Sequence, residues 1–128
     1  AHRLAEPLVW LGDLLNAVLL APQTSMTARV RSILAGDPAR NWSAGAAAHR
    51  VGASAPTLRR KLAAESTGFA EILSDVRMST ALTLIQTTAA PISDVAAAVG
   101  YDSPSRFAVR FRRRFGMAPT AIRGHQRD

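Results

Sequence analysis

Two stretches of the chain share one pattern: AGAAAHRVGASAPTLRRKL over residues 44–62 and ISDVAAAVGYDSPSRFAVRF over residues 92–111. When Gly52 is aligned with Gly100, small or apolar residues occupy equivalent positions upstream of both glycines, with the i, i+3, i+4, i+7 spacing of a helix that buries one face. A serine follows two or three residues after each glycine and can cap a second helix. Each stretch therefore predicts a helix-turn-helix unit.

The charge of the chain agrees with nucleic-acid binding. Its 128 residues include 16 Lys and Arg against 9 Asp and Glu, a formal charge of +7. Residues 41–128 hold 12 basic and 6 acidic residues, a net charge of +6, whereas residues 1–40 carry a net charge of +1. Because a surface that binds a polyanion must be basic, the repeated half is the expected DNA-binding half. Of the 16 basic residues, 15 are arginine, which favours bidentate contacts with phosphate or guanine.

The first forty residues predict two further helices and a connector. Proline at position 7 suits the first turn of a helix, and the leucines and valines of residues 8–19 form a broad apolar stripe. That stripe either packs against the rest of the domain or is part of a dimerising or sensor-linking helix. A shorter helix is expected from about Thr27 to Leu34, ended by Gly36 and Pro38. We therefore divide the chain into a helical connector, 1–40, and a DNA-binding domain, 41–128.

A single long helix is expected between the two units, from Phe69 to about Thr88. At about 1.5 Å per residue, twenty residues span roughly 30 Å, close to one turn of B-DNA at roughly 34 Å. In a helix-turn-helix unit the second helix can lie in the major groove of DNA and read its bases. A rigid spacer of this length would place these two reading helices, one from each unit, in successive major grooves. Arg77 lies within this spacer, so we expect it to have a structural role, through an ion pair with Asp75 or Asp94, rather than a contact with phosphate.

The candidate DNA-contacting residues lie on the sides of the second helices that face away from the predicted core. The expected base contacts are Pro56, Arg59, Arg60, Ser105, Arg106 and Val109. The expected phosphate contacts are Ser54, Lys61, Ser103, Arg110, Arg112 and Arg113. Arginine can bind guanine, and valine can contact the methyl group of thymine. The phenylalanines at positions 107, 111 and 115 repeat every fourth residue, and we interpret them as core.

The chain resembles the DNA-binding region of AraC/XylS-type bacterial transcription regulators. The resemblance covers about residues 42–124 and is carried by three tracts. They are Ala47-Ala48 to Gly52 with Ser54, Leu58 and Leu62; Phe69, Leu73, Arg77-Met78, Ala81 and Leu84-Ile85; and Pro91-Ile92 to Arg123. The resemblance implies an all-α fold of seven helices, in which a long helix joins two helix-turn-helix units, and regulation of transcription at promoter DNA. The family's base contacts would fall on Pro56, Arg59, Arg60, Ser105, Arg106 and Val109, the same face that the helical spacing predicts.

Enzymatic and membrane functions find little support in the sequence. The chain has no cysteine, its three histidines are dispersed, and no carboxylate cluster or phosphate-binding loop is present, so we expect no metal, no cofactor and no catalytic site. Its longest apolar stretch is too short to span a bilayer. Two alternatives stay open: a DNA-tethering arm of a recombinase or transposase, and a basic module that binds proteins or membrane surfaces.

The expected partners follow from the family resemblance. They are promoter double-stranded DNA, RNA polymerase, and a second copy of the chain that pairs through the N-terminal helix or through an upstream domain. The chain begins at Ala1 rather than Met, so we expect it to be a piece of a longer protein. The expected location is the bacterial cytoplasm, at the nucleoid.

Overall fold

The computed structural model describes residues 25–127, which contain seven helices and no strand. The helices are α2 (Met26–Ala35), α3 (Ala44–Arg50), α4 (Ala55–Ala64), α5 (Phe69–Thr87), α6 (Ile92–Ala98), α7 (Pro104–Phe115) and α8 (Pro119–Arg127). The predicted all-α fold, with two helix-turn-helix units and a long linker helix, is confirmed. The helix expected over residues 8–19 lies outside the described residues.

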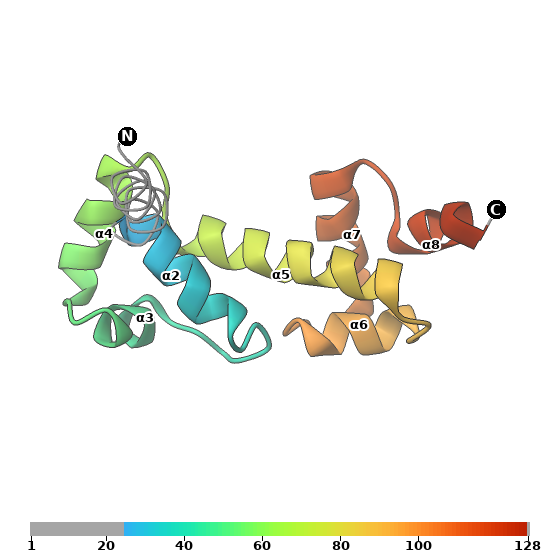
Figure 1. Cartoon of the computed structure of the whole chain (residues 1–128), viewed down its shortest axis with the longest axis horizontal. Coiled ribbons are helices and arrows are strands. Elements are labelled where there is room, and N and C mark those ends of the chain that lie inside the picture. Colours follow the sequence, from blue (N-terminus) through green and yellow to red (C-terminus); the bar gives the residue numbers. More distant parts are fainter. Residues whose placement is uncertain (1–24, 128) are drawn as a thin grey trace, which may run out of the picture.

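Helix α5 forms the axis of the molecule (Figure 1). It runs between two groups of helices, with α2, α3 and α4 at its N-terminal end and α6, α7 and α8 at its C-terminal end. Its 19 residues correspond to a length of about 28 Å. Each group contains one helix-turn-helix unit, so α5 is the spacer that the sequence predicts.

The helices begin at serines in the way that the sequence predicts. The side chains of Ser43, Ser54 and Ser103 each accept a hydrogen bond from a backbone N–H in the first turn of the following helix. These bonds satisfy backbone donors that have no partner inside a helix. Proline then occupies one of the first two positions of both α4 and α7, where no backbone donor is needed.

The two turns are built from the same pair of backbone hydrogen bonds. In the first unit, the N–H of Gly52 donates to the carbonyl of His49, and the N–H of Ala53 donates to that of Ala48. In the second unit, Gly100 and Tyr101 make the equivalent bonds to Ala97 and Ala96. Both glycines have positive φ, 74° and 90°, a region that glycine adopts without steric cost. The alignment of the two glycines therefore corresponds to one repeated Schellman turn.

The apolar core consists of two clusters that use different parts of α5. The first contains residues of α2, α3, α4 and the N-terminal half of α5, including Val30, Leu58 and Ile72. The second contains Met78, Ala81, Ile85, Val95, Ala96, Val99, Phe107 and Phe111. Helix α2 belongs to the segment 1–40, yet Met26, Val30 and Leu34 are buried in the first cluster. The first unit is therefore a three-helix body closed by α2.

The aromatic stripe of α7 packs as core. Phe107 and Phe111 are fully buried, and Phe115 is partly buried against the same cluster. Neighbouring rings in the stripe lie 5.6 and 4.6 Å apart between centroids. The C-terminal helix α8 is fastened to this end of the molecule by Arg123, whose guanidinium donates to the carbonyls of Thr88 and Ala90 just beyond the end of α5.

Candidate nucleic-acid interface

Helices α4 and α7 each bury one side and expose the other. Leu58 and Leu62 fix the inner side of α4, while Phe107 and Phe111 fix that of α7. In both helices the buried pair is four residues apart, so the residues between them point away from the core. The predicted base-contacting side chains of both helices are all exposed: Pro56, Arg59, Arg60, Ser105, Arg106 and Val109.

In the second unit, the predicted contacts gather around one open hollow. This hollow has a volume of about 520 Å³ and lies between the turn of the unit and the exposed side of α7. It is lined by Gly100, Tyr101, Asp102, Ser105, Arg106, Val109, Arg110 and Arg113. Val109 is 59% exposed, whereas most other large aliphatic side chains among residues 25–124 are buried or half-buried. An exposed valine among arginines suits a surface that meets both the thymine methyl and the phosphates of a major groove.

In the first unit, the predicted contacts are more spread out. Arg60 donates to the hydroxyl of Thr57 one turn earlier in α4, 3.2 Å away. Arg59 instead lines a groove between α4 and the start of α5, beside Phe69 and Ala70. Lys61 is exposed next to them in sequence. The structure thus does not bring Arg59 and Arg60 into a single hollow of the kind found on α7.

The predicted phosphate contacts lie at the N-caps and along the C-terminal halves of α4 and α7. Ser54 and Ser103 are the N-caps, so their hydroxyl oxygens already accept a backbone N–H. Arg112 and Arg113 are exposed in the last turns of α7, and Arg110 is exposed one turn earlier. Within the described residues, the side chains of these three arginines form no hydrogen bond or ion pair, so they are available to an anionic ligand.

Arg77 has the expected structural role, but with different partners. Its guanidinium donates to the carbonyls of Pro38 and Arg40, each 3.0 Å away. The expected ion pair with Asp75 or Asp94 is not formed. Asp75 and Arg77 are two residues apart in a helix and therefore point to different sides of α5.

Asp75, expected from the sequence only as a possible partner of Arg77, instead pairs with two other arginines. It forms ion pairs with Arg31 of α2 at 2.6 Å and with Arg114 of α7 at 3.3 Å. Burial by itself raises the pKa of the Asp75 carboxyl, but the hydrogen bonds and charges of the two arginines outweigh it and lower the pKa below its ordinary value. Arg114 lies 39 residues from Asp75, and no local periodicity identifies such a pair.

Glu65 ties the end of α4 to the start of α2. Its carboxylate accepts hydrogen bonds from the hydroxyl and N–H of Thr27 and from the N–H of Met26. These bonds lower the pKa of Glu65, and the one from the Thr27 hydroxyl has the largest effect. The end of the reading helix α4 is thereby fixed against the helix that closes the first unit.

Within residues 25–127, no group of three or more His, Cys, Asp or Glu side chains is arranged to hold a metal ion. No helix among these residues combines the length and apolar character needed to cross a bilayer. The exposed faces of α4 and α7 carry the predicted base contacts and form the candidate site.

Comparison with known proteins identifies the family. A family model described as a helix-turn-helix domain matches residues 47–125. The transcriptional regulator SirC of Salmonella typhimurium (strain SL1344) is 41% identical over 94 residues, which cover 73% of this chain and 32% of that protein. The chain thus spans about a third of the length of this relative.

Solved structures agree with the sequence relatives. A DNA-binding transcriptional dual regulator from Escherichia coli K-12 superposes with a TM-score of 0.77 at 33% identity, covering 79% of this chain and 91% of that one. The DNA-binding domain of AdpA, a global transcriptional factor solved in complex with a target DNA, shares the fold with a TM-score of 0.71 at 24% identity, covering 81% and 95% of the two chains. From its two repeated turns, its linker helix and these relatives, the chain belongs to the AraC/XylS family of helix-turn-helix transcription regulators, whose sequence-specific DNA-binding domain it comprises.

Proposed function

We propose that the chain reads promoter DNA with α4 and α7 in successive major grooves, one helix-turn-helix unit in each. The observation that carries this proposal is the repeated Schellman turn, which ends the first helix of both units and is followed in both by an exposed, arginine-bearing second helix. The target DNA bound by AdpA supports the same use of the fold.

Within this proposal, the residues divide into base readers and phosphate binders. Ser105, Arg106 and Val109 line the hollow of α7 and read bases, and Pro56, Arg59 and Arg60 do so on α4. The phosphate binders are Ser54, Lys61, Ser103, Arg110, Arg112 and Arg113. Because phosphate contacts fix position while base contacts carry sequence information, we expect α7 to supply more of the specificity.

The proposal includes the wider role of the protein. Promoter binding in the bacterial cytoplasm would bring the chain to RNA polymerase, and a second copy would bind through the N-terminal helix or an upstream domain. These partners are proposed from the family alone, because the chain spans only part of its relatives.

Salt-dependent binding to duplex DNA tests the proposal. If the protein neutralises about six to ten phosphates, log affinity should fall with log salt concentration with a slope of roughly −5 to −9. Fluorescence anisotropy with a duplex selected from a random library, and with a scrambled duplex of equal length, gives both the slope and the specificity. A flat salt dependence would refute phosphate binding, and equal affinity for both duplexes would refute base reading.

A further inference from the structure

The two halves of the molecule meet at a narrow waist in the middle of α5. Val76 is the last residue of this helix in the first core cluster, and Met78 is the first in the second cluster. The apolar core thus divides within two residues. Two bodies without a large shared hydrophobic interface are expected to move relative to each other. Polar contacts across the waist therefore matter more than they would within a continuous core.

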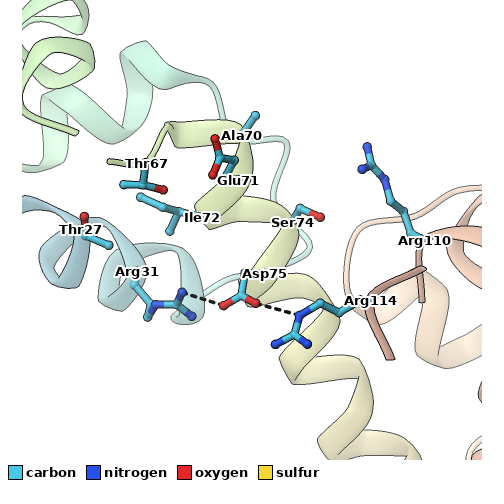
Figure 2. A pocket seen from close by; sticks show the side chains of 10 residues that line it. All are labelled: Thr27, Arg31, Thr67, Ala70, Glu71, Ile72, Ser74, Asp75, Arg110 and Arg114. Carbon is cyan, nitrogen blue, oxygen red and sulfur yellow. Dashed lines mark hydrogen bonds and ion pairs between the residues drawn. The ribbon is translucent and has the colours of Figure 1, made fainter. Parts of the chain in front are cut away.

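On one side of the waist, Asp75 joins both halves. Its two carboxylate oxygens are shared between Arg31 and Arg114, which approach from α2 and α7 (Figure 2). All three residues of this bridge line an open cleft of about 640 Å³ between the two units. Arg110 lines the same cleft but points away from Asp75 (Figure 2).

The arginines of this bridge differ in what they offer to DNA. Asp75 is 30% exposed, and its partners are about half exposed, so the pair energies are modest in isolation. A carboxylate shared by two arginines holds three side chains in one arrangement, however, and Arg114 is committed to α5 rather than to phosphate. The bridge therefore constrains how the C-terminal end of α7 packs against α5.

On the other side of the waist, Arg77 makes a second connection. Its two hydrogen bonds reach the loop between α2 and α3 in the first half. In the second half, its guanidinium lies 5.9 Å from the ring centroid of Tyr101, within range of a cation–π contact. The Tyr101 ring in turn meets Phe107 of α7 edge-on, with centroids 5.8 Å apart.

The turn of the second unit leaves room for this arginine. A Cβ atom on Gly100 would lie 2.9 Å from Nη2 of Arg77 and 3.0 Å from its Cζ. The corresponding Gly52 of the first unit has nothing within 4 Å of such an atom. Gly100 therefore serves both the turn and the approach of Arg77.

We infer that Asp75 and Arg77 are positioning residues that set the orientation of α7 relative to α4. Through this orientation they set the spacing that the protein requires between the two half-elements of its DNA site, the segments bound by α4 and by α7. The inference rests on the proposed function for its DNA consequence, but its structural part stands independently. Both residues project from the waist, each connects both halves, and neither is among the proposed DNA contacts.

The structural part is tested by measuring distances across the waist. The chain has no cysteine, so Ala64→Cys in α4 and Arg112→Cys in α7, both at exposed positions, can carry two spin labels without background. Double electron–electron resonance on the DNA-free protein should give a narrow distance distribution, which should broaden in the Asp75→Asn/Arg77→Gln variant. The Asp94→Asn variant, which removes an exposed carboxylate of α6 away from the waist, is the matched control and should stay narrow. An unchanged width in the double variant overturns the inference.

The DNA consequence is tested with a duplex that the wild-type protein selects from a random library, and with the same duplex carrying five extra base pairs between its half-elements. This insertion turns one element by about half a helical turn. We expect the wild type to lose about tenfold or more in affinity, and the double variant to lose less than about threefold.

Asp75→Glu/Arg77→Lys should restore part of the discrimination, because it keeps both charges. Equal discrimination by wild type and double variant, both folded by circular dichroism, overturns the positioning role. If the selected duplex contains one element only, the two-groove proposal fails, while the spin-label distances still decide the bridges.

Discussion

At the scale of single residues, the two turn glycines have the same backbone role and different surroundings. Gly52 and Gly100 both occupy the left-handed region, where a residue with a Cβ atom is strained. Only Gly100 also faces a guanidinium that would have to move. Substitutions at Gly52 and Gly100 can therefore separate two costs of adding a side chain: the backbone strain, which both positions share, and the displacement of Arg77, which occurs only at Gly100.

We predict that Gly100→Ala destabilises the protein more than Gly52→Ala. The Gly52 variant should lose about 1 kcal/mol, from backbone strain alone. The Gly100 variant should lose about 2 kcal/mol or more, because Arg77 must also give up hydrogen bonds to two carbonyls. Urea denaturation followed by circular dichroism measures both values, and equal losses would show that Arg77 yields without cost.

Arg106 and Arg113 provide a residue-scale test of the division between base and phosphate contacts. Arg106→Ala should cost about 1 to 3 kcal/mol on the selected duplex and less on a scrambled one, because a base contact is lost. Arg113→Ala should weaken binding to both duplexes alike and make the salt slope shallower by about 1. Equal losses on both duplexes for Arg106→Ala would remove it from the base readers.

At the scale of elements, the end of α4 shows a third use of the same turn. The N–H of Ser66 donates to the carbonyl of Ala63, and that of Thr67 donates to Leu62. Ser66 occupies the position that glycine holds in the other two turns, with φ of 64°. It is the one non-glycine residue with positive φ in the described part of the chain. The helix therefore ends at the cost of local backbone strain.

Ser66→Gly should stabilise the protein by about 0.5 to 1 kcal/mol, because glycine adopts this conformation freely. The same substitution in the exposed face of α2, Ser32→Gly, should have the opposite sign and cost about 0.5 kcal/mol, because glycine is a poorer helix former than serine. Thermal denaturation of both variants at equal protein concentration measures the difference. Destabilisation by Ser66→Gly would mean that the serine side chain contributes more than its strain costs.

The helices and turns could be predicted from the sequence because their signals are local. Serine caps, glycines at the turns and apolar residues at helical spacing all act within about eight residues, and the structure has the helices where they indicate. The hydrogen bonds and ion pairs of Asp75, Arg77 and Glu65 could not be predicted in this way, because the partners in these bonds lie 37 to 44 residues distant in sequence. Only the tertiary packing of the helices and of the α2–α3 loop brings such groups together.

At the scale of the whole molecule, Glu65 and Asp75, the carboxylates with lowered pKa values in the described part of the chain, both join separate elements. Glu65 joins α4 to α2, and Asp75 joins α2 and α7 to α5. A carboxylate whose pKa is lower in the folded state favours folding when it is ionised. Its contribution is fully present above the pKa of the unfolded chain, about 4, and is lost as the pH falls through the lower folded value.

We therefore predict that the free energy of unfolding decreases as the pH is lowered from about 5 to 3. In Glu65→Gln/Asp75→Asn this decrease should be shallower, because neither side chain can take up a proton. Denaturant titrations at each pH measure the slopes, and parallel slopes for wild type and double variant would contradict the linkage.

The exposed position of Lys61 on α4 has a practical consequence. It is the single lysine in the whole sequence, so its side-chain amine is a unique target for acylating reagents, apart from the amino terminus. A DNA backbone placed against α4 should shield that amine, and peptide mass spectrometry would detect the protection at one defined position. The protein thus carries a built-in chemical reporter of DNA contact by α4, because all its other Lys and Arg positions hold arginine, whose guanidinium group does not react with these reagents.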